Sequence, residues 1–345
     1  MGIRSRSKAI VAAAAVIAFG SSIAFAEPRP NESKIKAALD NSYAKVAKVK
    51  AGKNADYIPA LAKVDSNIFG IALVTVDGHV YTTGDVKSEV SIQSISKVFT
   101  LALVMEQRGI QAVEDNIGVD ATGQAFNSIV AIEQYKGKEM NPLVNPGAIA
   151  ATSMVKGDGR KAIWKNILDY YGEFAARPLS VNAEVFKSES ETNQRNQAIA
   201  ALMYAYGRIK DNPARATDIY TEQCAVSVNT KDLAIMAATL ANGGKNPVTG
   251  KTVMKAEDVP ELLSVMATAG LYDDSGKWFY RTGLPAKSGV GGGIIAVAPG
   301  KFGIASISPP LDAAGNSVKA QLAIEGVSKA LHANPLAATP VASTN

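Results

Sequence analysis

Two pairs of strand-like segments, one near each end of the chain, constrain its fold more than any other feature. In the first pair, residues 71–76 and 79–83 are rich in β-branched side chains and flank an Asp-Gly dipeptide, which is typical of tight hairpin turns. In the second pair, residues 292–298 and 302–308 flank a Pro-Gly-Lys turn. Strands from both ends most simply join in one antiparallel sheet.

Helical patterns surround and separate these hairpins. Residues 32–49 and 317–331 predict helices at the two ends of the fold, and the middle of the chain is mostly helical. Within the middle, helices are predicted over 94–108 (ended by Gly109), 195–208 and 230–242. We therefore predict an α+β fold in which terminal helices flank the sheet and a helical subdomain is inserted. The predicted domain, residues 27–332, comprises a sheet region (about 27–93 and 265–332) and a helical region (about 94–264).

The two ends of the chain are expected to lie outside this domain. Residues 1–26 have a basic start, an apolar stretch over 9–19 and a final Ala-Phe-Ala, which predicts a cleaved export signal. The alternative is an uncleaved anchor, but the apolar stretch is short for a membrane span. Signal removal implies a periplasmic or secreted protein with no membrane segment. Residues 333–345, with two prolines among small side chains, predict a flexible tail.

Charge and cysteine usage exclude several functional classes. The net charge of +5 includes three positive charges within the signal, so the mature chain carries about +2. No basic run lies beside aromatic residues, so we expect no nucleic-acid partner. Cys224 is the single cysteine, which precludes an internal disulfide, and its Ala/Val-rich surroundings predict a buried thiol. With only His79 and His332 in addition, both expected at the surface, no zinc site is expected.

Ser94 and Lys97 are the strongest candidates for catalysis. Residues three apart on a helix share one face, so Lys97 can reach the Ser94 hydroxyl and accept its proton. Lys97 must be neutral to do so, which requires burial or a nearby cation to lower its pKa. Lys287, which heads a glycine-rich strand in Lys-Ser-Gly, is a candidate for that cation.

The Ser-x-x-Lys pattern is common, and Ser33 and Lys36 also fit it without supporting context. Around Ser94, however, a predicted hairpin precedes the pattern, an apolar helix follows it, and Lys-Ser-Gly occurs at a later strand. This combination is the shared plan of penicillin-recognising serine enzymes.

A narrower resemblance covers most of the chain. Its motifs occur in order: Tyr57-Ile-Pro59, Gln93-Ser94-Ile-Ser-Lys97, Asn141-Pro-Leu-Val-Asn145-Pro-Gly-Ala-Ile149, Ser188-Glu189 with Arg195-Asn196, Ala237-Ala-Thr-Leu-Ala-Asn-Gly-Gly244, Gly283-Leu-Pro-Ala-Lys-Ser-Gly-Val290 and Ser308-Pro-Pro-Leu-Asp312. Together these blocks resemble the serine-dependent glutaminases. The resemblance implies a β-lactamase-like fold, hydrolysis of L-glutamine to L-glutamate and ammonia without a metal or organic cofactor, and a homo-oligomer, either dimer or tetramer.

The resemblance also implies roles for individual residues. Ser94 matches the nucleophile, Lys97 its base, and Tyr272 a tyrosine that passes a proton to the leaving ammonia. The backbone NH groups of Ser94 and Val290 match the oxyanion hole. The residues that match the binding site for the amino-acid part of the substrate are Tyr57, Asn145, Glu189, Asn196 and Tyr220. The chemistry agrees, because Glu189 can pair with an ammonium, and the amides and hydroxyls can donate to a carboxylate.

The sequence leaves two other functions open, a penicillin-recognising hydrolase and an amino-acid-binding protein. A β-lactamase or D-Ala-D-Ala carboxypeptidase would use the same serine and lysine, but the middle of the chain lacks a convincing Ser-x-Asn or Tyr-x-Asn triplet. A periplasmic amino-acid-binding protein would need two lobes of alternating strands and helices, and the sequence does not show that alternation.

Overall fold

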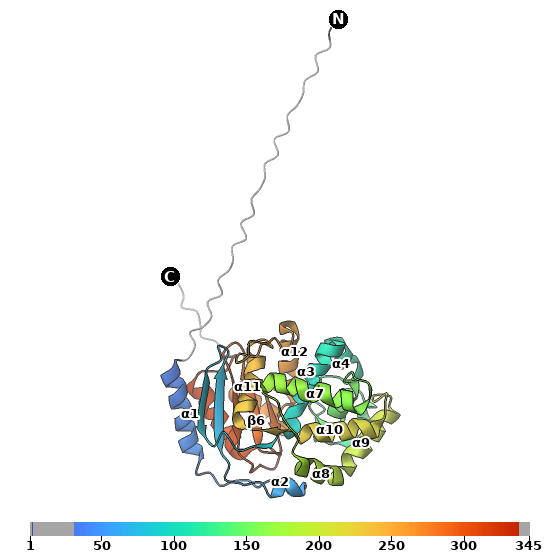
Figure 1. Cartoon of the computed structure of the whole chain (residues 1–345), viewed down its shortest axis with the longest axis horizontal. Helices are drawn as coiled ribbons and strands as arrows, with labels where there is room; N and C mark the ends of the chain where they lie inside the picture. The colour runs from blue at the N-terminus through green and yellow to red at the C-terminus, as the bar shows by residue number, and fades with distance from the viewer. Residues whose placement is uncertain (1, 3–30, 338–345) are drawn as a thin grey trace.

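The strands from the two ends of the chain join in a five-stranded antiparallel sheet in the computed structural model (Figure 1). The structure describes residue 2 and residues 31–337. The sheet order is β2-β1-β7-β6-β5, and the strands are β1 (Gly70–Thr75), β2 (Val80–Gly84), β5 (Ala286–Gly289), β6 (Gly293–Ala298) and β7 (Phe302–Ile307). The prediction that both hairpins belong to one sheet is therefore confirmed.

The pairing of β1 with β7 joins the strands from the two ends of the chain. Gly70 lies opposite Ile307 and Thr75 opposite Phe302, and the Ser306 hydroxyl donates to the Gly70 carbonyl at 2.9 Å. In the first hairpin only Gly78 of the Asp-Gly pair has a positive φ, +90°, and its NH donates to the Thr75 carbonyl. The turn thus uses the freedom of glycine alone rather than two left-handed residues.

Both faces of the sheet are covered by helices (Figure 1). The terminal helices α1 (Glu32–Val46) and α14 (Val318–Ala330), both predicted, pack on one face, where Ile71, Leu73 and Ile304 are buried. The other face, with Ala72 and Val74, packs on α11 (Thr230–Ala241) and the other helices of the middle region. Because side chains alternate along a strand, β1 presents an apolar side chain to each core in turn.

The helices of the middle region extend to one side of the sheet (Figure 1). Their bounds are α3 (Ser96–Arg108), α4 (Ile110–Asn116), α5 (Ile129–Tyr135), α6 (Asn145–Met154), α7 (Gly159–Ala175), α8 (Ala183–Thr192), α9 (Gln194–Ala205), α10 (Pro213–Cys224) and α12 (Val259–Ala269). Two short helices lie outside this stretch of sequence: α2 (Pro59–Ala62) precedes β1 and packs on α8, and α13 (Ser275–Thr282) precedes β5 and packs on α12 and α14. A two-residue strand, β3 (Val90–Ser91), pairs with β4 (Ser227–Val228). The division into a sheet region and an inserted helical subdomain stays a prediction.

The ends of the described chain bear on two further predictions. Ala333 is buried in the core between the sheet and the terminal helices, and its NH donates to the Ser328 carbonyl at 2.9 Å. The flexible tail predicted from Ala333 onward therefore does not begin at that residue. Apart from residue 2, the predicted export signal (residues 1–26) lies outside the described residues, as do residues 338–345. Within the described part of the chain, no helix combines the length and apolar character needed to cross a bilayer.

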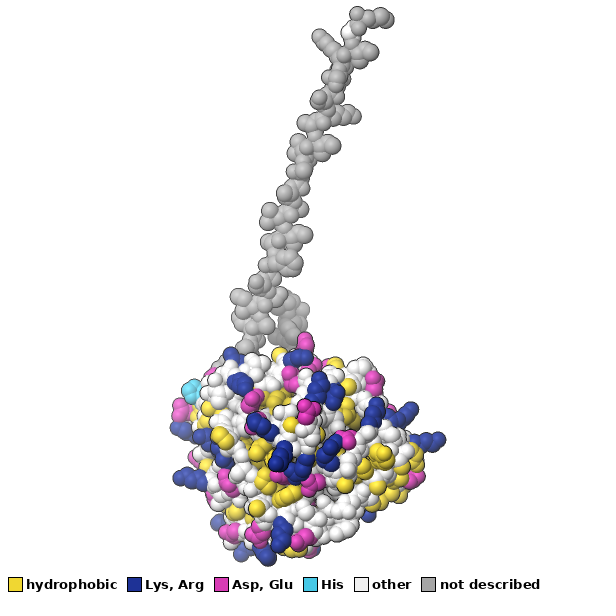
Figure 2. Space-filling view, turned by 45° about the vertical axis from the view of Figure 1, so that its right-hand side comes forward, with side chains coloured by type: hydrophobic (Ala, Val, Ile, Leu, Met, Phe, Trp, Pro, Cys, Tyr) yellow, Lys and Arg dark blue, Asp and Glu magenta, His cyan; other side chains and the backbone are white. Residues whose placement is uncertain are grey.

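Charged side chains are spread over the surface. On the face drawn in Figure 2, Lys and Arg side chains are interspersed with Asp and Glu side chains. His79 and His332 are exposed, as predicted. Cys224 is buried, as predicted, and its thiol is free.

Candidate functional site

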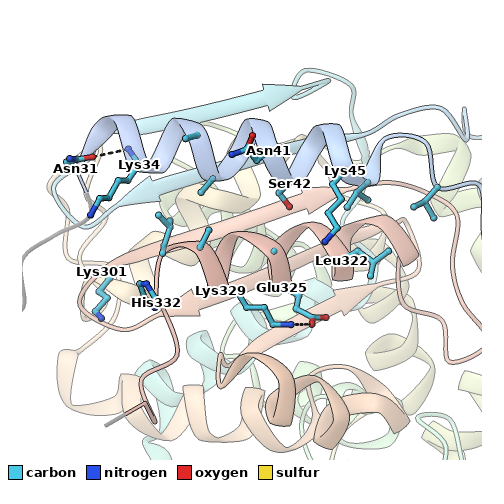
Figure 3. Close-up of a pocket in the computed structure, with 17 residues that line it drawn as sticks. Asn31, Lys34, Asn41, Ser42, Lys45, Lys301, Leu322, Glu325, Lys329 and His332 are labelled. Atoms are coloured by element: carbon cyan, nitrogen blue, oxygen red, sulfur yellow. Dashed lines mark hydrogen bonds and ion pairs between the residues drawn. The ribbon is translucent and has the colours of Figure 1, made fainter. Parts of the chain in front are cut away.

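Several hollows mark the surface of the described chain, and two of them differ clearly in character. An open groove of about 1010 Å³ runs between α1 and α14, and its charged lining includes Lys34, Lys45, Lys329 and Glu325 (Figure 3). Glu325 in this groove is already paired with Lys329 at 2.5 Å. The groove contains none of the predicted catalytic residues.

The second, smaller hollow is the candidate active site. It is a cavity of about 250 Å³ to which the sheet edge and several helices of the middle region contribute. Eight of the ten predicted site residues line it: Tyr57, Ser94, Asn145, Glu189, Asn196, Tyr220, Tyr272 and Val290. The other two, Lys97 and Lys287, are completely or almost completely buried, at 1% and 0% exposure. The structure thus gathers residues that the sequence spreads over more than half of the chain.

Ser94 lies in a tight turn immediately before α3. The helix predicted to begin at Ser94 begins at Ser96, and residues Gln93–Ile95 form a 3-10 turn instead. Gln93 has a φ of +50°, an unfavourable conformation for a residue with a side chain. In this turn, the Ser94 side chain lies in the cavity wall, two residues before the first residue of α3.

The surroundings of Lys97 make its side chain easier to deprotonate than that of a lysine in water. Its Nζ donates to Asn145 Oδ1 at 2.7 Å, at the first residue of α6. Burial lowers the pKa of Lys97 from its ordinary value to about 8, although the nearby Cys224 and Glu189 act in the opposite direction. A substantial fraction of Lys97 is therefore neutral in mildly alkaline solution.

Lys287 and Tyr272 form the opposite side of the site. Lys287 Nζ donates to the carbonyls of Gly270 and Ser288, both at 2.8 Å, and lies 4.2 Å from the centre of the Tyr272 ring. Burial holds the pKa of Lys287 well below its usual range, and the charge of Lys97 lowers it further. The expectation that Lys287 would lower the pKa of Lys97 therefore needs correction, because burial is what lowers that pKa.

Tyr272 brings a protonated hydroxyl into the cavity. Burial raises the pKa of Tyr272 to about 12, and contact with the Ser94 side chain offsets part of that rise. The hydroxyl is buried and has no hydrogen-bond partner of normal geometry among the described residues. The backbone of Tyr272 has a φ of +53°, which is unfavourable for a residue with a side chain. Tyr272 and Gln93 are thus two cavity residues with a strained backbone.

Glu189 supplies the negative charge of the cavity. It lies on α8, is 7% exposed, and accepts a hydrogen bond from Gln93 Nε2 at 3.2 Å. Burial raises the pKa of Glu189 to about 7, while the Gln93 hydrogen bond and the charge of Lys97 oppose that rise. A bound cation would therefore stabilise the ionised carboxylate considerably.

Asn145 connects Lys97 to the remaining polar residues of the cavity wall. Its Oδ1 accepts from Lys97 and from the Tyr220 hydroxyl at 3.1 Å, and its Nδ2 donates to Asn196 Oδ1 at 2.9 Å. Tyr57, by contrast, is 56% exposed, which places it at the outer part of the cavity lining.

The end of β5 approaches the Ser94 turn closely because Gly289 has no side chain. A Cβ at Gly289 would lie 2.7 Å from the Ile92 carbonyl oxygen and 3.3 Å from the Ser94 backbone nitrogen. The glycine of Lys-Ser-Gly thus allows Val290 to follow directly beside the turn.

Sequence reasoning missed part of the cavity lining. Gln93, Phe126 and Cys224 all line the cavity, and the Phe126 and Tyr272 rings lie 4.8 Å apart. Gln93 is adjacent to Ser94 and could have been suspected, but no local pattern marks Phe126 or Cys224 as cavity residues. In residues 31–337, no cluster of three or more His, Cys, Asp or Glu side chains could hold a metal ion.

Comparison with known proteins shows the family of the chain. A family model described as Glutaminase matches residues 52–335. The chain belongs to the glutaminase family. It is 56% identical to a glutaminase of Colwellia psychrerythraea over 88% of this chain and 98% of the relative. A glutaminase of Mycobacterium ulcerans is 50% identical over 87% of this chain and 94% of the relative.

Solved glutaminase structures have the same fold. One, described as a probable glutaminase, has a TM-score of 0.87 at 47% identity and covers 88% of this chain and 98% of its own. A second, a probable glutaminase from Bacillus subtilis complexed with 6-diazo-5-oxo-L-norleucine, has a TM-score of 0.78 at 27% identity, with coverages of 91% and 100%. The predicted β-lactamase-like class is thus supported by the glutaminase fold of these neighbours.

Proposed function

We propose that this chain hydrolyses L-glutamine to L-glutamate and ammonia through a glutamyl ester of Ser94. The observation that carries the proposal is the buried Lys97, whose pKa of about 8 suits a base and which lies one helical turn after a serine in the cavity wall. The glutaminase relatives, which match along most of the chain, support the substrate.

In the first half of the reaction, Ser94 Oγ attacks the side-chain amide carbon of glutamine while Lys97 Nζ takes the hydroxyl proton. The backbone NH groups of Ser94 and Val290 stabilise the oxyanion, which requires them to face the carbonyl oxygen. Collapse of the tetrahedral intermediate breaks the carbon–nitrogen bond. The buried Tyr272 hydroxyl donates a proton to the leaving nitrogen and regains one from Lys97.

In the second half, water attacks the ester carbonyl as Lys97 and Tyr272 again accept and return a proton. The carbon–oxygen bond to Ser94 breaks, glutamate leaves, and the serine hydroxyl is restored. Protons and atoms balance over the cycle, with water consumed and ammonia released.

The rest of the cavity recognises the amino-acid part of the substrate. Glu189 pairs with the α-ammonium, because a buried carboxylate with a raised pKa gains strongly from a neighbouring cation. Polar groups donate to the α-carboxylate, and we assign this role to Tyr57, Asn145, Asn196 and Tyr220. The Tyr220 hydroxyl must turn from Asn145 Oδ1 toward the substrate to do so.

The deciding experiment compares the mature protein with Ser94→Ala by ammonia release from L-glutamine. We expect turnover by the parent and none by a variant with an unchanged melting temperature. Cleavage of nitrocefin or a D-Ala-D-Ala peptide in place of glutamine would identify a penicillin-recognising hydrolase instead. Glutamine binding without ammonia release would indicate an amino-acid-binding protein.

We also propose that the protein is exported, with residues 1–26 removed, and that it works as a homo-oligomer, either dimer or tetramer. The basic start, apolar stretch and Ala-Phe-Ala ending support export. N-terminal sequencing of the protein from the cell envelope or medium should begin at Glu27. Light scattering should give two or four chain masses, and a monomer of full activity would exclude the oligomer.

A further inference from the structure

A buried hydrogen-bond network connects the first turn of α3, which contains Lys97, to α7 and α10, and its members Tyr171, Thr100 and Gln223 do not line the cavity. Tyr171 of α7 is 0% exposed, and its hydroxyl donates to the Ser96 backbone carbonyl at 2.8 Å. The same hydroxyl lies 2.6 Å from Thr100 Oγ1. Ser96 and Thr100 are one helical turn apart on α3, so Tyr171 bridges the two ends of the turn that contains Lys97.

The network continues to α10, the helix whose residues Tyr220 and Cys224 line the cavity. Thr100 Oγ1 donates to Gln223 Oε1 at 2.9 Å, and Gln223 lies on α10. The same helix carries Tyr220, whose hydroxyl donates to Asn145, the acceptor of the Lys97 ammonium. The lysine is therefore fixed at both ends of its side chain by elements that the network holds together.

We propose that Tyr171 is a positioning residue that acts through Lys97, by fixing the first turn of α3 against α7 and α10. The inference rests on the proposed function, since it assigns Tyr171 to the alignment of the proposed base. Burial raises the pKa of Tyr171, so the hydroxyl stays protonated and able to donate throughout the pH range of turnover. A loss of alignment should lower kcat because proton transfer needs correct geometry, while substrate binding stays unchanged.

The neighbouring tyrosine offers a matched control. Tyr170 lies on the same helix and is 8% exposed, but its buried hydroxyl has no hydrogen-bond partner among the described residues. Both rings pack on aromatic side chains, with Tyr171 against Phe99 at 6.0 Å and Tyr170 against Phe174 at 5.2 Å. Substitution by phenylalanine keeps this packing in each case and removes only the hydroxyl.

The experiment measures kcat and KM for L-glutamine in the full mature chain of Tyr171→Phe and Tyr170→Phe. We expect a fall in kcat of about tenfold for Tyr171→Phe with KM within about twofold. Tyr170→Phe should match the parent in both constants. Thr100→Val, which removes the partner hydroxyl, should reproduce the Tyr171→Phe defect and provides the test if Tyr171→Phe does not fold.

A background without the base separates positioning from general structural support. In Lys97→Ala, addition of Tyr171→Phe should not change the residual turnover further, because the network then has no base to align. An equal loss of kcat in Tyr170→Phe, an unchanged kcat in Tyr171→Phe, or a full additional loss in the Lys97→Ala background would overturn the inference. Absence of Ser94-dependent turnover in the parent would instead overturn the proposed function.

Discussion

Lys97 Nζ and Asn145 Oδ1 lie 2.7 Å apart in the interior of the protein, where a neutral amide rather than a carboxylate accepts the hydrogen bond of the lysine. A carboxylate at that place would stabilise the charged ammonium, whereas the amide satisfies a donor without doing so. The pairing therefore leaves Lys97 with the pKa of about 8 that burial gives it.

The pH dependence of turnover should report this pKa. Lys97 acts in its neutral form, so kcat/KM, which reports groups of the free protein, should rise with pH below about 8 and level off above it. Initial rates at glutamine concentrations well below KM, between pH 6 and 9.5, would show this limb. A kcat/KM that is independent of pH over that range would exclude Lys97 as the base.

Asn145→Asp tests the neutral partner directly. The new carboxylate should raise the pKa of Lys97, so the rising limb should move to higher pH and kcat/KM at pH 7 should fall about tenfold or more. Asn166→Asp is the control, because Asn166 is exposed and does not line the cavity. A rising limb that stays in place in Asn145→Asp would contradict the argument.

Removal of the cavity carboxylate should mainly affect substrate binding. Glu189→Gln should raise KM by about 30-fold or more, because the substrate ammonium loses its buried partner. The rising limb of kcat/KM should also move to lower pH, since the Glu189 charge raises the pKa of Lys97. Glu191→Gln, at an exposed position of the same helix, serves as control. A KM equal to that of the parent would remove Glu189 from substrate recognition.

Gly289→Ala should disrupt the nucleophile turn. Its Cβ would lie 2.7 Å from the Ile92 carbonyl, so Val290 and the Ser94 turn must move apart, and kcat should fall about 100-fold with the oxyanion hole. Gly276→Ala has open space around its Cβ and should keep activity. Retention of full activity by Gly289→Ala would show that this contact does not shape the site.

A residue of the interior strand β1 should contribute more to stability than a residue of the edge strand β2. Ile71→Ala, at a position of 0% exposure between the sheet and the terminal helices, should lower the free energy of unfolding by roughly 2–5 kcal/mol. Val80→Ala on the edge strand β2, where Val80 is 37% exposed, should cost much less. Urea unfolding of both variants measures the difference, and equal losses would contradict it.

Local patterns predicted the two hairpins, the terminal helices and the Ser94–Lys97 pair, because these features depend on short spacings. The resemblance to glutaminases was needed for Asn145 and Glu189, which are unremarkable in their own segments. Phe126 and Cys224 reach the cavity only through the packing of distant helices. The two-residue strands β3 and β4 are too short to give a periodic signal, and the position of α11 on the sheet follows from tertiary packing.

The bond from Ser306 to Gly70 spans 236 residues of sequence, and it has a consequence for how the chain acquires its shape. During synthesis, β1 is made long before β7, its neighbour in the sheet, so the sheet cannot be completed until β7 has been added to the chain. Ser94 follows the early strands, whereas Lys287 lies on the late strand β5 and Val290 directly after it. Growing chains that stop short of β5 therefore lack part of the proposed site and should have no hydrolytic capacity.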